Sequence, residues 1–98
     1  MTQYVYNADG IAVGYVRANH IHGMNGNAIG QLRGSHVHKL NGAYIGELHQ
    51  DMVVNKRLGT LQNIGNSGNP GNPGAPGRPA RRPPATHGYP DVFEELLR

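Results

Sequence analysis

The sequence predicts an all-β fold in which four tandem β-hairpin repeats form a pseudo-four-fold closed ring, followed by a Gly/Pro-rich tail and a short C-terminal helix. Three observations predict this fold: a sixteen-residue period, an Asp/Asn-Gly pair at the same place in the first three copies, and columns of aliphatic residues on either side of it. A fixed period of this kind indicates one supersecondary unit stacked on copies of itself.

The copies begin at Tyr4, His20, His36 and Met52, and the last ends near Asn63. The fourth copy lacks the Asp/Asn-Gly pair, so its second half arrives three residues early. We therefore divide the 98 residues into a repeat domain (1–63), a collagen-like or polyproline II linker (64–90) and an amphipathic docking peptide (91–98).

Each copy is expected to be a two-stranded hairpin, because β-branched residues flank a central turn. The Asp/Asn-Gly pairs favour a type I′ turn, which needs positive φ at both central residues. The columns that would face a common axis are Val5, Ile21, Val37, Val53; Val13, Ile29, Ile45, Leu58; and Val16, Leu32, Leu48, Leu61.

Glycine recurs at two places in the repeat. The first belongs to the turn, and the second lies between two aliphatic residues that are three apart, which breaks strict alternation. We expect a β-bulge or a close backbone approach at this second glycine, where a Cβ would clash. The repeated glycines are Gly10, Gly14, Gly26, Gly30, Gly42, Gly46 and Gly59.

One hairpin alone is marginal in water, so the four must bury their aliphatic residues together. A closed ring around a narrow apolar centre also limits exposed strand edges. An open eight-stranded meander or half-barrel is the alternative arrangement.

The repeated motif of an aliphatic, an aromatic, a short Asp/Asn-Gly turn and then V/I-G-x-V/L resembles the bacterial four-fold β-flower domain. The resemblance covers residues 4 to about 63, and the Asn-Pro-Gly run that follows is similar to tails of such domains. The openings here read Val-Tyr-Asn, Ile-His-Gly, Val-His-Lys and Val-Val-Asn in place of the family's Ile-Tyr-Asp. The resemblance implies the fold and self-association, and it carries no activity.

Composition limits the partners that we expect. A repeat body of about sixty residues is marginal by itself, and without cysteine the usual supplements are oligomerisation or a metal. The absence of cysteine, of a leader-like start and of a long apolar stretch predicts a cytoplasmic protein that does not bind membranes. Net charge is +3 without a dense basic patch, so no nucleic-acid partner is expected.

Two pairs of histidines are candidate metal ligands for zinc or nickel, because side chains two apart on a strand share a face. The equivalent positions hold Tyr4, Tyr6, Met52 and Val54, which instead favours a half-buried packing face and no cofactor. A pH-sensitive interface is a further possibility. The candidate ligands are His20, His22, His36 and His38.

No catalytic residues are predicted, and we expect no enzyme. The chain has no cysteine, and Ser35 and Ser67 lie in turn or tail contexts. The repeat domain has only the scattered acids Asp9, Glu47 and Asp51, and Asp9 is explained as a turn residue.

Five Gly-x-y triplets begin at Gly65, a pattern typical of collagen and polyproline II. We favour a solvated, semi-rigid spacer. The alternative is a polyproline II strand that lies on its own ring or on a partner chain.

The last nine residues predict a short helix with Asp91 as N-cap and Glu94 as its capping-box partner. An apolar stripe on a tether suggests docking into another subunit or partner, although it could equally pack on its own ring. The docking residues would be Val92, Phe93, Leu96 and Leu97.

The favoured function is a non-enzymatic assembly or binding module that self-associates through the ring or docks its tail onto a partner. The alternative is a protein that binds a metal on the histidine face, or a long apolar ligand along the ring axis.

Overall fold

The computed structural model describes residues 3–56, 64–66, 68, 70–84 and 88–97. In this part of the chain the regular elements are seven β-strands and one 3-10 helix. They are β1 (Gln3–Tyr6), β2 (Ala12–Arg17), β3 (His20–Gly23), β4 (Ala28–Arg33), β5 (His36–Lys39), β6 (Tyr44–His49), β7 (Met52–Val54) and η1 (Phe93–Leu97). The expected last strand, with Leu58, Gly59 and Leu61, lies outside the described residues.

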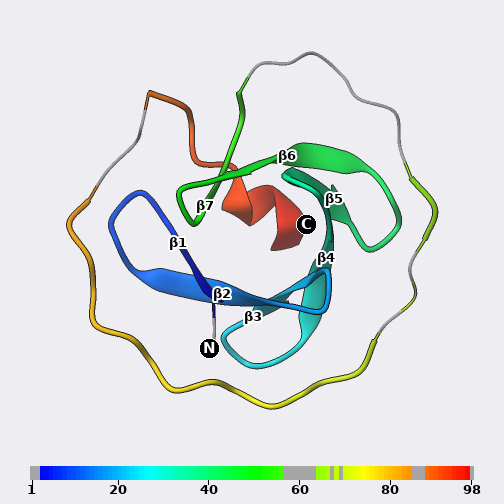
Figure 1. Ribbon diagram of the computed structural model, residues 1–98, viewed down its shortest axis with the longest axis horizontal. Coiled ribbons are helices and arrows are strands. Elements are labelled where there is room, and N and C mark those ends of the chain that lie inside the picture. Colours follow the sequence, from blue (N-terminus) through cyan, green and yellow to red (C-terminus); the bar gives the residue numbers. More distant parts are fainter. Residues whose placement is uncertain (1–2, 57–63, 67, 69, 85–87, 98) are drawn as a thin grey trace.

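The strands form one sheet in which antiparallel neighbours follow one another in chain order, from β1 to β7. The sheet curls until its two ends meet. At the meeting point the Tyr6 amide of β1 donates to the Asp51 carbonyl, just before β7, at 2.7 Å. Seen down its axis, the nearly closed ring surrounds η1 (Figure 1). The predicted all-β ring is confirmed.

The second glycine of each hairpin lies beside a bulge. Val5 pairs with Gly14 and Tyr6 with Ala12, so Val13 is the extra residue. The same register shift occurs in the next two hairpins. A Cβ on Gly14 would overlap the carbonyl oxygen of His22 on the neighbouring strand. The predicted bulge and close approach are therefore both confirmed in these three hairpins.

The predicted type I′ geometry of the Asp/Asn-Gly turns is wrong. Only the glycine has positive φ, for example Gly10 at 83°. The Gly10 amide donates to the Asn7 carbonyl, and the Asn7 amide donates to that of Ile11, each at 3.0 Å. This is a three-residue loop that ends in a left-handed glycine. Two-residue turns with positive φ at both positions are found instead at Ala18 and Asn19, between β2 and β3, and at Gln50 and Asp51, between β6 and β7.

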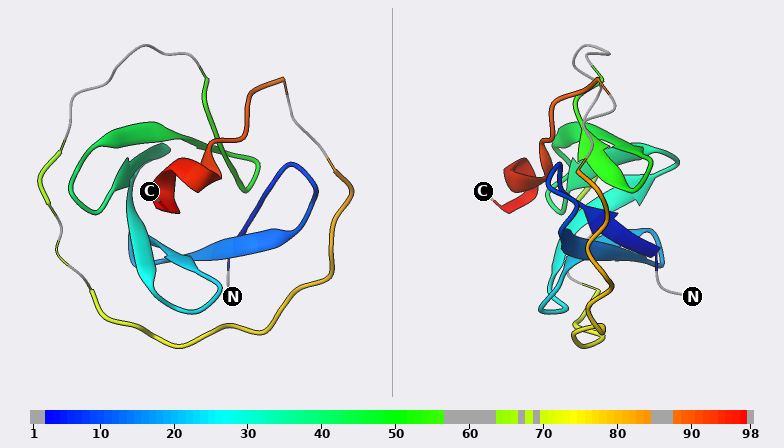
Figure 2. Two further views of the ribbon diagram at one scale, coloured as in Figure 1. Left: turned by 180° about the vertical axis from the view of Figure 1, so that it is seen from behind. Right: turned by 90° about the vertical axis from the view of Figure 1, so that its left-hand side faces the viewer.

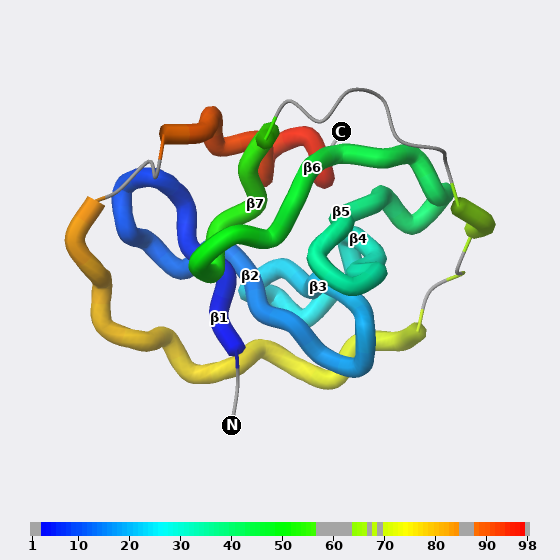
Figure 3. The backbone as a smooth tube through the Cα atoms, turned by 45° about the horizontal axis from the view of Figure 1, so that its top comes forward, coloured from blue at the N-terminus to red at the C-terminus, as the bar shows by residue number. Residues whose placement is uncertain are grey.

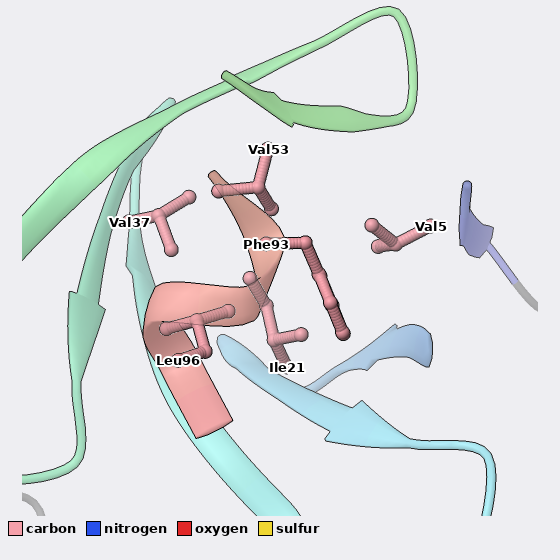
Figure 4. Packing of buried hydrophobic residues seen from close by; sticks show 6 residues of the cluster. All are labelled: Val5, Ile21, Val37, Val53, Phe93 and Leu96. Carbon is pink, nitrogen blue, oxygen red and sulfur yellow. The ribbon is translucent and has the colours of Figure 1, made fainter. Parts of the chain in front are cut away.

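The core lies on the ring axis. The first aliphatic column supplies one fully buried residue per repeat. Phe93 and Leu96 of the C-terminal η1 pack among these four buried side chains (Figure 4). The other two columns, where described, are partly buried around this centre. The first column comprises Val5, Ile21, Val37 and Val53.

The described part of the tail runs round the outside of the ring, past the hairpin tips, before the chain turns inward (Figures 1 and 3). Seen edge-on, η1 lies over one face of the ring (Figure 2). The chain thus contacts its own ring twice, first at the rim and then at the centre. The described tail residues lie along their own ring, which is one of the placements that the sequence left open, and most of them stay exposed to solvent.

Candidate docking site for the C-terminal tail

The residues before η1 occupy the sheet position next to β7. Val54 pairs with Asp91 in an antiparallel bridge. The Val92 amide donates to the Val53 carbonyl, and the Asn55 amide donates to the Pro90 carbonyl, each at 2.9 Å. The tail therefore adds a short strand segment to the edge of β7 through main-chain hydrogen bonds.

This added segment keeps the register of the repeat. In the first three hairpins the residues equivalent to Val54 pair with the first residue of the second strand. Asp91 takes that place opposite Val54, so Val92 corresponds to the second aliphatic column. Like the members of that column, Val92 is partly buried against the core. The tail thus supplies, in the fourth quarter, what the second strand supplies in the other three.

The repeat glycines make room for the apolar side chains that follow. A Cβ on Gly14 would lie 3.3 Å from Phe93, one on Gly30 would lie 2.9 Å from Leu96, and one on Gly46 would lie 3.0 Å from Val92. Each second glycine of the three described hairpins is therefore matched to a different side chain of the tail. We call Val92, Phe93 and Leu96 the plug.

Asp91 joins the plug to the first hairpin. Its carboxylate accepts the amide of Phe93 at 3.0 Å, which is the predicted N-cap contact. The other carboxylate oxygen accepts the amide of Ala8, also at 3.0 Å. One side chain thus begins η1 and ties it to the β1–β2 loop.

Of the predicted docking residues, the structure buries Phe93 and Leu96 in the chain's own ring and leaves Leu97 61% exposed. Leu97, the last position of the predicted stripe, does not share the buried face of Leu96, because η1 is a 3-10 helix whose turn is tighter than that of an α-helix. The structure brings the plug together and places Leu97 outside it.

The rim of the ring contacts the tail at regular intervals. The Ile64 amide donates to the Gly42 carbonyl at 2.9 Å, and the Arg82 amide donates to the Gly10 carbonyl at 3.0 Å. These contacts are eighteen residues and two hairpins apart, so the tail advances nine residues, or three triplets, per hairpin. The residue halfway between them is Pro73, which has no amide hydrogen. Here the Asn72 side chain donates instead to Asn27 Oδ1 at 3.0 Å and to the Asn25 carbonyl at 3.3 Å.

Side chains of the sheet contact the tail at the same spacing of nine tail residues per hairpin. Gln31 Nε2 donates to the carbonyl of Gly65 at 3.0 Å, and the equivalent Tyr15 hydroxyl donates to that of Gly74 at 2.9 Å. Tyr4 donates through its hydroxyl to the Gly77 carbonyl. Hydrogen-bond donors on the ring therefore face the carbonyl groups that the extended tail leaves without internal partners.

Arg82 adds a cationic contact near the point where the ring closes. Its guanidinium donates to the Gln50 carbonyl at 2.9 Å and lies 4.4 Å from the centre of the Tyr6 ring. Stacking on an aromatic face is a favourable place for arginine. The last rim contact thus fixes the tail shortly before it turns toward β7.

The four candidate metal ligands do not form one ligand set. His22 and His38 are buried, and each Nδ1 lies 3.0 Å from the turn carbonyl of its own hairpin, Gly26 and Gly42 respectively. Because a carbonyl only accepts, Nδ1 carries the proton in both. His20 Nδ1 lies 3.3 Å from the Ala18 carbonyl. Throughout the described ranges, no three His, Cys, Asp or Glu side chains are grouped closely enough to hold a metal ion.

The fourth histidine, His36, belongs to a network around Glu47. Ser35 donates to Glu47 Oε1 at 2.9 Å, whereas Tyr44 and His36 lie 2.8 and 2.7 Å from Oε2. Burial by itself raises the pKa of Glu47, but the three hydrogen bonds outweigh it and hold this pKa below its usual value. Burial, together with the bond to Glu47, raises the pKa of Tyr44 to about 12.

The hydrogen bonds of this network do not have the arrangement of a catalytic triad. Ser35 donates to the carboxylate and not to the imidazole, so the three groups lack the relay that activates a serine nucleophile. Glu47 is equivalent to Tyr15 and Gln31, but its described partners are His36 and Tyr44 of its own repeat and Ser35, the last residue of the preceding one. The position that binds tail carbonyls in two copies thus holds an acceptor in the third.

Sequence reasoning missed Glu47, Tyr15, Gln31 and Arg82. Two of them could have been found, because a donor at the same place in the first two copies matches a carbonyl-rich tail. Which carbonyl each donor binds depends on the direction in which the tail runs around the ring, and only the structure provides that direction.

No helix in the described part of the chain is long and apolar enough to cross a membrane.

Comparison with known proteins gives a family but no individual relative. No curated protein and no solved structure matches the chain. The sequence model of a family described as "4-fold beta flower protein" matches residues 3–93, which include the tail and Phe93 as well as the repeats. The observed ring of repeated hairpins agrees with that description. This chain therefore belongs to the 4-fold beta flower family.

Proposed function

We propose that this chain is a non-enzymatic assembly module in which the fit between tail and ring is the joining device. One observation carries the proposal. Pro90–Val92 complete the edge of β7 and the plug completes the core, although about 35 residues separate β7 from this segment. The contacts do not depend on which copy of the chain supplies the tail.

Two physical arguments support exchange of the tail between copies. Adding a strand to an exposed edge is a common mode of protein association, because main-chain hydrogen bonds give affinity and side-chain sockets give specificity. Exchange of an identical element between protomers also forms dimers at low free-energy cost, since the interface is already optimised within the monomer.

Linkage within one chain favours the intramolecular form at low concentration. A segment that is joined covalently to its own binding site has an effective concentration that can reach the order of mM. Exchange between copies is therefore expected to become important at high protein concentration, or on partial unfolding that releases the plug.

The first test is the solution mass of the full chain across concentration, measured by light scattering. We expect a concentration-dependent mass above the monomer, and a monomer for Phe93→Ala with Leu96→Ala. Leu97→Ala is the matched control and should behave as the parent, because Leu97 is exposed. Equal masses for the parent and the plug variant at every concentration would contradict the proposal.

A second test forces the choice between the two forms. Joining Lys56 directly to Pro90 removes the residues needed to reverse the chain between β7 and the added strand, so the plug must reach another copy. We expect an oligomer from this deletion and a monomer when a four-residue Gly/Asn turn replaces the deleted segment. A folded monomer from the direct joint would show that the plug is not required beside β7.

A further inference from the structure

An open groove lies between the tips of the first two hairpins, beside η1. Its volume is about 640 Å³. The large hydrophobic residues that are exposed in the described part of the chain, Ile11 at 38% and Leu97 at 61%, both line it. Residues from opposite ends of the sequence thus place apolar surface toward the same space. The larger apolar residues of the lining are Ile11, Val13, Met24, Ile29, Phe93 and Leu97.

The charged residues of the groove are mainly acidic. Asp9, Asp91 and Glu94 line it together with one base, Arg78. A second base lies at the rim, where Arg81 Nε donates to the Asp9 carbonyl at 3.0 Å. The lining therefore carries two more negative than positive charges, in a chain whose net charge is +3. The local charge is opposite to that of the molecule.

We propose that this groove binds a small organic cation with an apolar body, of the arylalkylamine class. The volume lies within the range of small-molecule sites, roughly 300–1,000 Å³. The apolar lining suits a hydrocarbon or aromatic body, and the excess of carboxylates favours a positive over a negative head group. An anion of the same shape meets the same apolar walls and the opposite electrostatic preference.

The docked tail builds part of this site. Asp91, Phe93, Glu94 and Leu97 form one wall, Arg78 comes from the rim part of the tail, and the first two hairpins form the rest. The groove therefore exists when the tail lies as described, whichever copy supplies it. The proposal does not depend on exchange between copies, and ligand binding should stabilise the docked tail by mass action.

The test is a titration of the full chain with 4-phenylbutylamine and, separately, 4-phenylbutyrate, followed by methyl NMR. At neutral pH these probes share a body and differ in the sign of their charge. We expect the amine to shift the methyl signals of Ile11, Met24 and Leu97 in a saturable manner, while those of Ile45 and Leu48 stay in place. The carboxylate should bind at least severalfold more weakly.

Asp9→Asn with Glu94→Gln should weaken binding of the amine by roughly three- to tenfold, as expected for partly exposed charge pairs. Glu95→Gln is the matched control, because Glu95 adjoins Glu94 but does not line the groove. Equal affinity for both probes, shifts spread over all apolar methyl groups, or an unchanged affinity in the double variant would each overturn the proposal. So would shifts that depend on protein concentration alone, since these indicate that a second copy covers the groove.

Discussion

At the scale of single residues, the turn glycines satisfy two independent requirements. Gly26 has φ of 90°, a region that favours glycine, and a Cβ there would overlap the side chain of Asn72. The same overlap with the tail occurs at Gly10 and Gly42, at the backbone of Arg82 and Ile64. The glycine required by the turn thus also permits the tail to approach.

Gly26→Ala should therefore lower the free energy of unfolding by more than the strain of the turn alone accounts for. Backbone strain at positive φ accounts for about 1–3 kcal/mol, and displacement of Asn72 adds the loss of its contacts. Chemical denaturation should show a lower free energy of unfolding. Gly77→Ala is the control, because nothing lies within 4 Å of its Cβ position and its φ is not in the left-handed region. A similar loss in both variants would refute this account.

The network around Glu47 predicts a stability limit at each end of the pH scale. The pKa of Glu47 is lowered in the folded state, so its contribution is present at neutral pH and is lost as pH falls below about 4.5 through the folded value. The pKa of Tyr44 is raised from 10.0 to about 12, so that contribution is present below pH 10 and is lost between pH 10 and 12.

Denaturation of the parent, Glu47→Gln and Tyr44→Phe across pH checks these directions. The stability advantage of the parent over Glu47→Gln should shrink in acid. Its advantage over Tyr44→Phe should shrink between pH 10 and 12. Differences that are independent of pH would mean that neither group is perturbed by folding.

At the scale of elements, η1 is too short to be stable alone, and packing of its buried residues holds it in place. Phe93 and Leu96 are each only 5% exposed. Phe93→Ala should lower the free energy of unfolding by about 3–5 kcal/mol, because it leaves a cavity on the axis. Leu97→Ala should change it by less than about 0.5 kcal/mol. Thermal and chemical denaturation compare the two, and equal effects would place Phe93 outside the core.

At the scale of the whole molecule, the described hydrogen bonds hold the tail in one register on the ring. Inserting one Gly-Asn-Pro triplet after Pro76 should move Arg82 away from Gly10 while leaving the Gly65 contact with Gln31. Hydrogen exchange at the Arg82 amide, which donates to Gly10 in the parent, should then accelerate. The same insertion after Pro84, beyond that contact, is the control and should leave this amide protected. Equal exchange rates in the two insertions would show that the tail contacts tolerate a shift of register.

Local sequence determined the repeated part of this protein. The period, the second glycine and the first aliphatic column predicted hairpins, bulges and an apolar axis, because each depends on residues within one repeat and its neighbour. The turn type was predicted wrongly, because Asp9-Gly10 is compatible with both a two-residue and a three-residue loop. The register of the bulged strand is compatible only with the longer loop.

Only the tertiary structure decided where the tail lies. Asp91 opposite Val54, Gly65 at Gln31 and Phe93 beside Gly14 join residues that are 34 to 79 positions apart. Such contacts depend on the curvature of the closed ring, and no periodicity in the sequence encodes that curvature.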